Sequence, residues 1–462
     1  MSAASISSAI FKAYDIRGVV HSTLTTDAVR LIGTALGSEA REKNIPAICV
    51  GRDGRLSGPM LRDALVAGIT STGTDVIDVG MVPTPVLYFS TVHLETGSGV
   101  EITGSHNPPE YNGLKMMLGG ATLYGDGIQA LRARIERGNL VVAATPGTER
   151  MADVLPAYLE RIRTTVKLAR PMKIAIDCGN GVAGPTAVTL FRALGCEVGE
   201  LYTDIDGTFP NHHPDPAHPE NLQDLIRTLR DTDAELGLAF DGDGDRLGVV
   251  TKDGQIVYPD RQIMLFAQDV LAAHPGAEII FDVKCTRQLA PWIRKHGGRP
   301  TMWRTGHSLI KAKLKESGAP FAGEMSGHLF FNDRWPGFDD GLYAGARLLE
   351  ILSRSADPSA VLNALPTAVC TPELHLKTAE GENFALVERL QKEAEFEGMS
   401  ELITIDGVRA EWPDGFGLAR PSNTTPVVVL RFEGDTPEAL ARIQAAFRKA
   451  IAKVAPDARL PF

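Results

Sequence analysis

Leu236-Gly-Leu-Ala-Phe-Asp-Gly-Asp-Gly-Asp245 is an apolar stretch that ends in an acidic, glycine-rich loop. Two further stretches have the same form: Ser98-Gly-Val-Glu-Ile-Thr-Gly-Ser-His-Asn107 and Pro320-Phe-Ala-Gly-Glu-Met-Ser-Gly-His328. A short apolar run bounded by turn residues is typical of a strand. The recurrence of a strand followed by an unusual polar loop predicts one structural unit repeated three times.

Each of these stretches comes late in a similar succession of elements. A leading strand is expected at 48–53, 174–179 and 279–284, followed in each copy by a helical segment and a second strand. This alternation predicts βαβ units on mixed, largely parallel sheets, where ligands bind beyond the carboxyl ends of the strands. Three similar α/β domains could therefore each offer one loop to a shared central cleft. The alternative is that βαβ units resemble one another by composition alone.

The pattern changes after about Thr367. Strand-like stretches at 402–406, 408–412 and 427–432 precede an amphipathic helix at about 437–454, which predicts a C-terminal α+β domain. A chain of 462 residues is too long for one hydrophobic core. We expect four domains: 1–150 with the serine loop, 151–254 with the acidic loop, 255–366 with the third loop, and 367–462.

Composition excludes several classes of protein. No run approaches the roughly 18 apolar residues of a membrane-spanning helix, and the stretch from Met1 to Ile6 has no basic region followed by an apolar one, so secretion is not expected. The five cysteines are scattered, which favours a reducing cytoplasm. The net charge of -10 argues against nucleic acid or an anionic membrane as partner. A phosphate ester would then need a local island of cations, for which the candidates are Arg17, Lys115, Arg246 and Lys284.

The strongest local signal is Asp241-Gly-Asp-Gly-Asp-Arg246. Three alternate carboxylates separated by glycines can surround one hard cation, and close carboxylates repel one another without one. An EF-hand is excluded, because its sixth and twelfth positions would be Arg246 and Lys252 in place of glycine and glutamate. Mg²⁺ is favoured, since three carboxylates leave room for a phosphate oxygen. A solvated acidic turn is the simpler alternative.

Three other loops carry candidate chemistry. Ser105 follows a strand and precedes a proline-terminated turn, so its hydroxyl could accept a phosphoryl group; alternatively the motif is only a capped turn. No G-x-S-x-G elbow is present at this serine, and we expect the adjacent His106 to be badly placed as its base. Glu324 and Ser326 alternate and could bind sugar hydroxyls beside His328, although Glu324 could instead cap a helix. Arg420-Pro-Ser-Asn-Thr-Thr425 could be an anion cradle or an ordinary hairpin turn.

These loops, in this order, resemble those of the α-D-phosphohexomutase superfamily, and most closely its bacterial bifunctional phosphomannomutase/phosphoglucomutase group. The resemblance extends from Phe11-Lys-Ala-Tyr-Asp-Ile-Arg-Gly18 to the loop at Arg420. It implies four domains around one cleft and an enzyme that moves a phosphoryl group between the 1- and 6-positions of a hexose. The loop Gly-Glu-Met-Ser-Gly-His has the form seen in the group that accepts both mannose and glucose.

The resemblance also implies roles for single residues. Ser105 matches the phosphoserine, which also contributes to the metal site formed by Asp241, Asp243 and Asp245. Lys115 and His328 match positions proposed as general acid or base. The remaining matches are Arg17 and Arg246 among the catalytic cations, Glu324 and Ser326 for sugar hydroxyls, Arg420, Ser422, Asn423 and Thr424 for the phosphate that is not transferred, and Tyr14, Lys284 and His307 for other contacts to substrate.

The expected activity is therefore reversible interconversion of mannose 1- and 6-phosphates and of glucose 1- and 6-phosphates. Mg²⁺ is the expected cofactor, and glucose 1,6-bisphosphate the expected activator and intermediate. Hexose phosphates are the only partners expected, with a monomer favoured over a dimer. The alternatives are a phosphoglucosamine mutase, a non-catalytic sensor of sugar bisphosphates and a calcium-binding structural protein.

Overall fold

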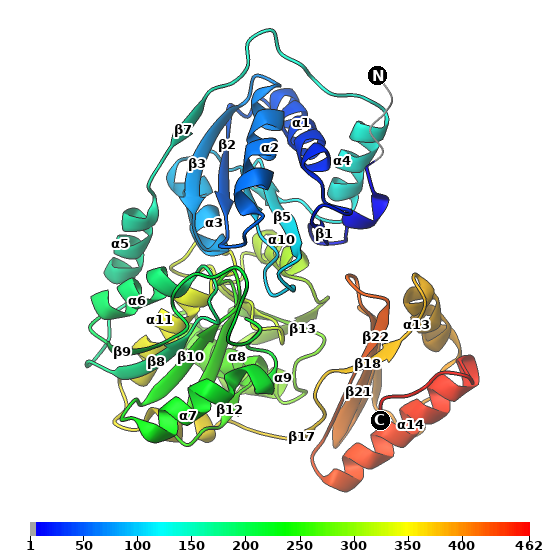
Figure 1. The fold of residues 1–462 in the computed structure, drawn as a ribbon. Helices are drawn as coiled ribbons and strands as arrows, with labels where there is room; N and C mark the ends of the chain where they lie inside the picture. The colour runs from blue at the N-terminus through cyan, green and yellow to red at the C-terminus, as the bar shows by residue number, and fades with distance from the viewer. Residues whose placement is uncertain (1–5) are drawn as a thin grey trace.

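A computed structural model describes residues 6–462 and contains four sheets (Figure 1). The first sheet has the order β1-β5-β4-β2-β3-β7, with β6 beside β5. Its strands are β1 (Ile16–Val19), β2 (Ala47–Arg52), β3 (Asp75–Met81), β4 (Gly99–Ile102), β5 (Tyr111–Leu118), β6 (Ala121–Thr122) and β7 (Glu149–Met151). The 3₁₀ helix η1 (Ser8–Ile10) precedes them, and the helices are α1 (Thr26–Glu42), α2 (Gly58–Thr70), α3 (Thr84–His93) and α4 (Asp126–Glu136).

The second and third sheets follow the same plan. The second has the order β12-β11-β10-β8-β9, with strands β8 (Lys173–Asp177), β9 (Glu197–Leu201), β10 (Leu236–Phe240), β11 (Leu247–Thr251) and β12 (Ile256–Val257). Its helices are α5 (Leu155–Thr165), α6 (Gly184–Ala193), the 3₁₀ helix η2 (Pro219–Leu222) and α7 (Gln223–Asp231). The third has the order β14-β13-β15-β16, with β13 (Glu278–Asp282), β14 (Arg299–Trp303), β15 (Phe321–Gly323) and β16 (Leu329–Phe331). Its helices are α8 (Pro259–Ala273), α9 (Leu289–Lys295), α10 (His307–Ser317), α11 (Gly341–Leu352) and α12 (Pro358–Asn363).

The three sheets share a core of four strands. In the orders β3-β2-β4-β5, β9-β8-β10-β11 and β14-β13-β15-β16, the first three strands are parallel and the fourth is antiparallel to the third. The three polar loops occupy the same place, the turn between the third strand and its antiparallel partner. The predicted repeat is therefore confirmed at the level of topology, and composition alone does not account for it.

The fourth sheet has a different construction. Its order is β17-β22-β21-β20-β19, with β18 beside β22, and every pair is antiparallel. The strands are β17 (Val369–Cys370), β18 (Leu374–Lys377), β19 (Glu401–Ile403), β20 (Val408–Trp412), β21 (Gly415–Pro421) and β22 (Val427–Gly434). The predicted helix is α14 (Pro437–Val454), and a second helix that the sequence analysis did not predict is α13 (Glu382–Glu393). This is the expected α+β module.

One hydrophobic cluster spans parts of the first three units, while most of the core of the first unit forms a second cluster and the fourth unit has a third. One cluster joins α3 of the first unit, through Leu87 and Phe89, to Trp335 and Tyr343 of the third, and it also contains the second sheet. The fourth sheet packs on its two helices around its own cluster, which includes Phe432 and Phe447. No helix within residues 6–462 is long and apolar enough to cross a membrane. The fourth unit lies beside the other three, and its β21–β22 tip points toward the first (Figure 1).

Candidate active site

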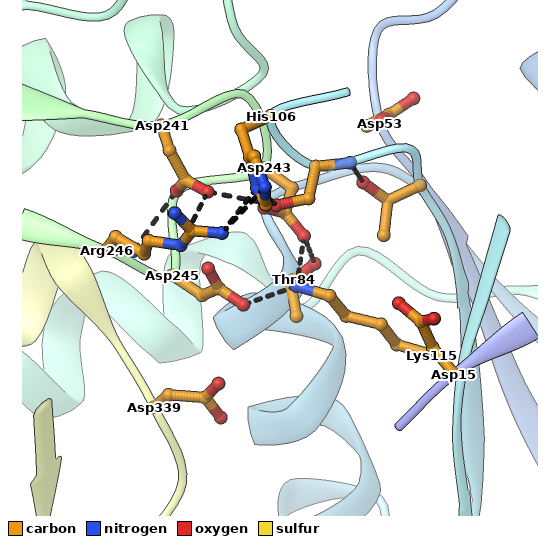
Figure 2. Close-up of polar contacts among 12 residues, drawn as sticks. Asp15, Asp53, Thr84, His106, Lys115, Asp241, Asp243, Asp245, Arg246 and Asp339 are labelled. Atoms are coloured by element: carbon orange, nitrogen blue, oxygen red, sulfur yellow. Dashed lines mark hydrogen bonds and ion pairs between the residues drawn. The ribbon is translucent and has the colours of Figure 1, made fainter. Parts of the chain in front are cut away.

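The serine loop and the acidic loop meet face to face, although they lie about 140 residues apart in the sequence (Figure 2). The Ser105 hydroxyl donates to Oδ2 of Asp241 over 3.0 Å, and both residues are buried. Only glycine fits at position 242 beneath the serine, because an added Cβ would lie 2.3 Å from the Ser105 carbonyl oxygen. Close packing of backbone on backbone thus brings a potential nucleophile to the carboxylates.

The backbone of Ser105 has a φ of +48°, in the left-handed region that residues with a side chain seldom adopt. Its N–H donates to the Thr103 hydroxyl over 2.7 Å, and the Asn107 N–H donates to the Gly104 carbonyl over 2.9 Å. A strained residue held by such bonds is common at functional sites. The tight turn places the hydroxyl at the mouth of the acidic loop.

Arg55 holds the serine loop in shape, and the sequence analysis missed it. Its buried guanidinium donates to the Ser105 carbonyl over 2.8 Å and forms three further bonds, to the carbonyls of Asn107 at 2.5 Å, Pro108 at 2.6 Å and Tyr111 at 3.0 Å. Asp53 lies 3.2 Å from the Arg55 Nε and accepts from the Gly104 N–H over 3.2 Å. The one available signal was the pair of charged residues directly after strand β2.

Asp241, Asp243 and Asp245 form a compact carboxylate cluster. One oxygen of each lies within 4.8 Å of the others, and all three side chains are buried. Lys115 on β5 donates to Asp243 over 2.7 Å and also to Asp245, while the Thr84 hydroxyl at the start of α3 donates to Asp243 over 2.6 Å. The acidic loop is thus held by side chains of the first unit on one side.

The cluster fits a divalent metal ion. Among the described residues, Oδ1 of Asp243 and Oδ1 of Asp245 are buried and accept no hydrogen bond, although His328 Nε2 lies 3.4 Å from the latter. Burial, Asp245 and Asp243 together raise the pKa of Asp241 well above its ordinary value, so Lys115 alone does not stabilise three charges. Three oxygen ligands around a hard cation would relieve this repulsion. An acidic metal-binding site is therefore present.

Lys115 is charged in this setting. Burial disfavours the ammonium, but the carboxylates of Asp243 and Asp245 outweigh it and raise the pKa of Lys115 well above its ordinary value. Burial likewise opposes ionisation of Asp245, yet Lys115 keeps the pKa of Asp245 well below the usual range. The ammonium thus occupies one oxygen of each of these two carboxylates and leaves the other oxygen free.

The side chain of His106 lies closer to the Ser105 hydroxyl than the sequence analysis expected. Its Nδ1 is 3.1 Å from the Ser105 hydroxyl, so the expectation that His106 is badly placed was wrong in distance. However, the Arg246 guanidinium donates to the same nitrogen. Burial and Arg246 together hold the pKa of His106 well below its ordinary value, so the ring is neutral and its Nδ1 is already occupied. Arg246 also lies 3.6 Å from both Asp241 and Asp215.

The third loop reaches the cluster through His328. Its Nε2 is 3.4 Å from Asp245, and its Nδ1 is 2.8 Å from the Ser326 hydroxyl and 3.5 Å from Glu324. His307, at the start of α10, stacks on the His328 ring at a centroid separation of 5.4 Å. The serine, acidic and third loops therefore form one site.

Glu324 makes the helix-capping contact that was one of the two interpretations the sequence left open, and its contact to sugar stays a prediction. Its Oε1 accepts from the Gly306 N–H over 2.5 Å, directly before helix α10, so it does cap a helix. Its other oxygen faces His328. Burial raises the pKa of Glu324 to about 7.

The fourth loop forms the tip between β21 and β22. Arg420 is buried and donates through Nε to Asp406 over 3.0 Å, while its Nη2 has no partner among the described residues. The Ser422 hydroxyl accepts from the N–H groups of Thr424 at 3.3 Å and Thr425 at 3.2 Å, which makes a tight turn. The free guanidinium nitrogen is therefore available to an anion.

Tyr14 connects this loop to the rest of the site, and Lys284 contacts another part of the fourth unit. The Tyr14 hydroxyl of the first unit donates to the Thr305 carbonyl over 2.7 Å and accepts from the Asn423 amide. Lys284, after β13, donates to Glu373 over 2.6 Å. Between residues 6 and 462, no hydrogen bond or ion pair joins the fourth loop directly to the serine loop. Arg17 borders the serine loop itself, donating to the Gly104 carbonyl over 3.2 Å.

Three repeated α/β domains and a fourth α+β domain bring together a serine, a carboxylate cluster and a set of arginines and lysines. These groups define an enzyme of phosphoryl transfer. The chain belongs to the phosphoglucomutase/phosphomannomutase family. The family's alpha/beta/alpha domains I, II and III match residues 8–141, 156–254 and 258–369, and its C-terminal domain matches 373–450.

Relatives of known name agree with this assignment. The chain is 60% identical to the phosphoglucomutase of Neisseria gonorrhoeae, over 97% of this chain and 98% of that one. It is 55% identical to the phosphomannomutase/phosphoglucomutase of Pseudomonas aeruginosa strain PAO1, over 100% of this chain and 99% of that one. The crystal structure of a phosphoglucomutase/phosphomannomutase family protein from Burkholderia thailandensis superposes with a TM-score of 0.94 at 60% identity, covering 99% of this chain and 100% of that one.

Proposed function

We propose that this enzyme interconverts the 1- and 6-phosphates of mannose and of glucose through a phosphoserine at Ser105 and a bound hexose 1,6-bisphosphate. The observation that carries the proposal is the 3.0 Å hydrogen bond from the Ser105 hydroxyl to Asp241, inside a cluster of carboxylates and cations. A sensor of sugar bisphosphates would need no hydroxyl at that place.

Asp241, Asp243 and Asp245 would hold Mg²⁺ together with the phosphorylated Ser105. Bound there, Mg²⁺ would neutralise charge on the phosphoryl oxygens. Arg17 and Arg246 supply positive charge from the two sides of the serine loop. Lys115 and His328, which both approach Asp245, are the candidates to move the proton of the sugar hydroxyl.

The substrate must bind in two orientations, because each of its two oxygens reacts in turn. We propose that one phosphate faces Ser105 while the other is bound by Arg420, Ser422, Asn423 and Thr424. Glu324 and Ser326 would accept and donate hydrogen bonds to sugar hydroxyls, with Tyr14, Lys284 and His307 completing the contacts. A carboxylate and a hydroxyl that bind neighbouring hydroxyl groups tolerate both orientations better than a contact shaped to one end of the sugar.

The division of labour follows the chain. We propose domains at 1–150, 151–254, 255–366 and 367–462, which would supply the phosphoserine, the metal, the sugar contacts and the phosphate cradle, respectively. Glucose 1,6-bisphosphate would activate the enzyme by phosphorylating Ser105. Hexose phosphates are the only partners proposed, for a monomeric enzyme in the cytoplasm.

Phosphorus NMR tests the function directly. Glucose 1-phosphate and mannose 1-phosphate are each incubated with enzyme, Mg²⁺ and a trace of glucose 1,6-bisphosphate. Conversion of both to 6-phosphates, abolished by chelator, is expected. Conversion of neither would contradict the proposal, and glucosamine 1-phosphate would then test the alternative of a phosphoglucosamine mutase.

A further inference from the structure

The connection from β13 to α9, residues 283–288, belongs to the third unit but is bound by side chains of the fourth. It carries Lys284, which is proposed above to contact substrate. Val283 packs in a small apolar cluster with Phe416 and Leu418 of strand β21. The segment therefore lies where the two units meet.

Arg409 on β20 makes the strongest contact between the fourth unit and residues 283–288. Its guanidinium is fully buried and donates through one nitrogen to the carbonyls of Val283 at 2.5 Å and Cys285 at 2.7 Å. These are the two carbonyls on either side of Lys284. The guanidinium also lies 3.7 Å from the centre of the Phe416 ring and pairs with Glu411, so its position is fixed from three directions.

The following residues are held from the same side. The Thr286 hydroxyl donates to Glu433 over 2.9 Å, and the Arg287 N–H donates to the same carboxylate over 3.2 Å. The Arg287 guanidinium pairs with Asp435. Both partners lie at or just after the end of β22. The fourth sheet thus holds the segment in addition to the third unit, in which the Val283 N–H donates to the Trp303 carbonyl over 3.0 Å and the Thr286 N–H donates to Asp260 over 3.0 Å.

The Lys284 side chain is also bound at the start of the fourth unit. Its ammonium donates to Glu373 over 2.6 Å. Backbone and side chain of Lys284 are thus both held by the unit that carries Arg420.

We propose that Arg409 is a positioning residue that fixes Lys284 to the fourth domain, so that Lys284 and the Arg420 loop approach the substrate as one body. The proposal rests on the proposed function, in which both cations contact substrate. It follows that a movement of the fourth domain relative to the first would carry Lys284 with it, although Lys284 belongs to the third domain by sequence.

A double-mutant cycle tests this coupling. Arg409→Gln removes the guanidinium, Lys284→Ala removes the ammonium, and kcat and KM are measured for both single variants and the double variant. Arg409→Gln alone should lower kcat/KM at least about tenfold, mainly through KM. In the Lys284→Ala background the same change should have an effect of less than about twofold, because Arg409 acts through Lys284. Equal effects in both backgrounds would overturn the proposal.

Hydrogen exchange gives a readout that does not depend on activity. In Arg409→Gln, amides of residues 283–288 should exchange faster while those of β13 remain protected. Unchanged exchange of 283–288 would also overturn the proposal. If that variant does not fold, Arg409→Lys, which retains a charged donor, should show the same pattern to a smaller degree. Arg442→Gln is the matched control, since Arg442 stacks on Trp412 and pairs with Asp414 at the surface of the same domain.

The two proposals fail separately. A wild-type enzyme that converts neither hexose phosphate would refute the proposed function, while the exchange experiment would still measure the attachment of 283–288 to Arg409. An active enzyme with additive kinetic effects would leave the function intact and refute the coupling.

Discussion

Replacement of Arg55 by glutamine should abolish most of the activity without removing any group that touches substrate. Arg55 makes four hydrogen bonds to carbonyls of the serine loop and one ion pair to Asp53; the pair and the bond to the Ser105 carbonyl are buried, and the other three bonds are partly buried. Glutamine keeps part of the side-chain volume but can supply two N–H groups at most. Carbonyls of the loop would then lack donors, including the buried carbonyl of Ser105.

The size of the effect follows from the buried pair. Removing one partner of a buried ion pair costs about 3–5 kcal/mol, because the other charge remains without compensation. Here that charge is Asp53, which also accepts the Gly104 N–H. If the loop leaves its native conformation to avoid this cost, the native loop becomes the minor state. In that case kcat should fall about a hundredfold or more.

Two measurements separate loop disorder from global unfolding. Phosphate content at Ser105 after incubation with glucose 1,6-bisphosphate reports the loop, and far-UV circular dichroism reports the fold. Arg52→Gln is the matched control, since Arg52 makes one bond of 3.3 Å to the Asp53 carbonyl. The double variant Arg55→Gln/Asp53→Asn should recover stability but not turnover. An Arg55→Gln enzyme with kcat within threefold of wild type would refute this reasoning.

Three further changes have definite expected results. Ser105→Ala should reduce kcat by several orders of magnitude and leave the Kd for glucose 1-phosphate nearly unchanged, because the nucleophile is lost while the cradle remains; normal turnover would exclude the phosphoserine. Arg420→Ala should raise KM about 10- to 100-fold with a smaller change in kcat, since a hydrogen bond to a charged group contributes about 1.5–3 kcal/mol, and an unchanged KM would show that Arg420 does not bind phosphate. Asp340→Asn should flatten the dependence of stability on pH. Burial raises the pKa of Asp340 to about 7 in the folded protein. The contribution of this group to the stability of the wild-type protein is therefore greatest below about pH 4, and up to about 4 kcal/mol is lost as the pH rises to 7. Urea unfolding of wild type and Asp340→Asn at pH 5 and pH 8 measures that difference, and parallel losses in the two proteins would contradict it.

The sequence allowed the fold class and the central loops to be predicted for a physical reason. A strand followed by a loop with a demanding backbone leaves a local signature, such as alternating Asp and Gly at 241–245 or the turn at Ser105. The three copies share one topology, so the loops had to fall at equivalent places. Both the carboxylate cluster and the serine beside it could therefore be anticipated from local patterns.

Contacts between distant segments left no such signature. Arg55 binds carbonyls about 50 residues away, and a carbonyl is the same for every residue type, so nothing in the sequence marks the partner. Thr84 and Asp243 meet only because the first two units share a core. The closeness of His106 to Arg246 depends on the turn at Ser105 and could not be predicted from its position next to the serine.

The cations of the site explain how a chain with a net charge of -10 can bind a phosphate ester. They are not free charges on a positive surface: Lys115 lies on Asp243, Lys284 on Glu373, and Arg420 on Asp406. A carboxylate partner fixes the orientation of each cation before substrate arrives, so little reorganisation is needed on binding. The carboxylate partner also lowers the attraction of the cation for singly charged anions. A phosphate dianion carries enough charge to compete with that carboxylate. Paired cations should therefore select for phosphate esters over singly charged acids, which a net charge calculated over the whole chain cannot reveal.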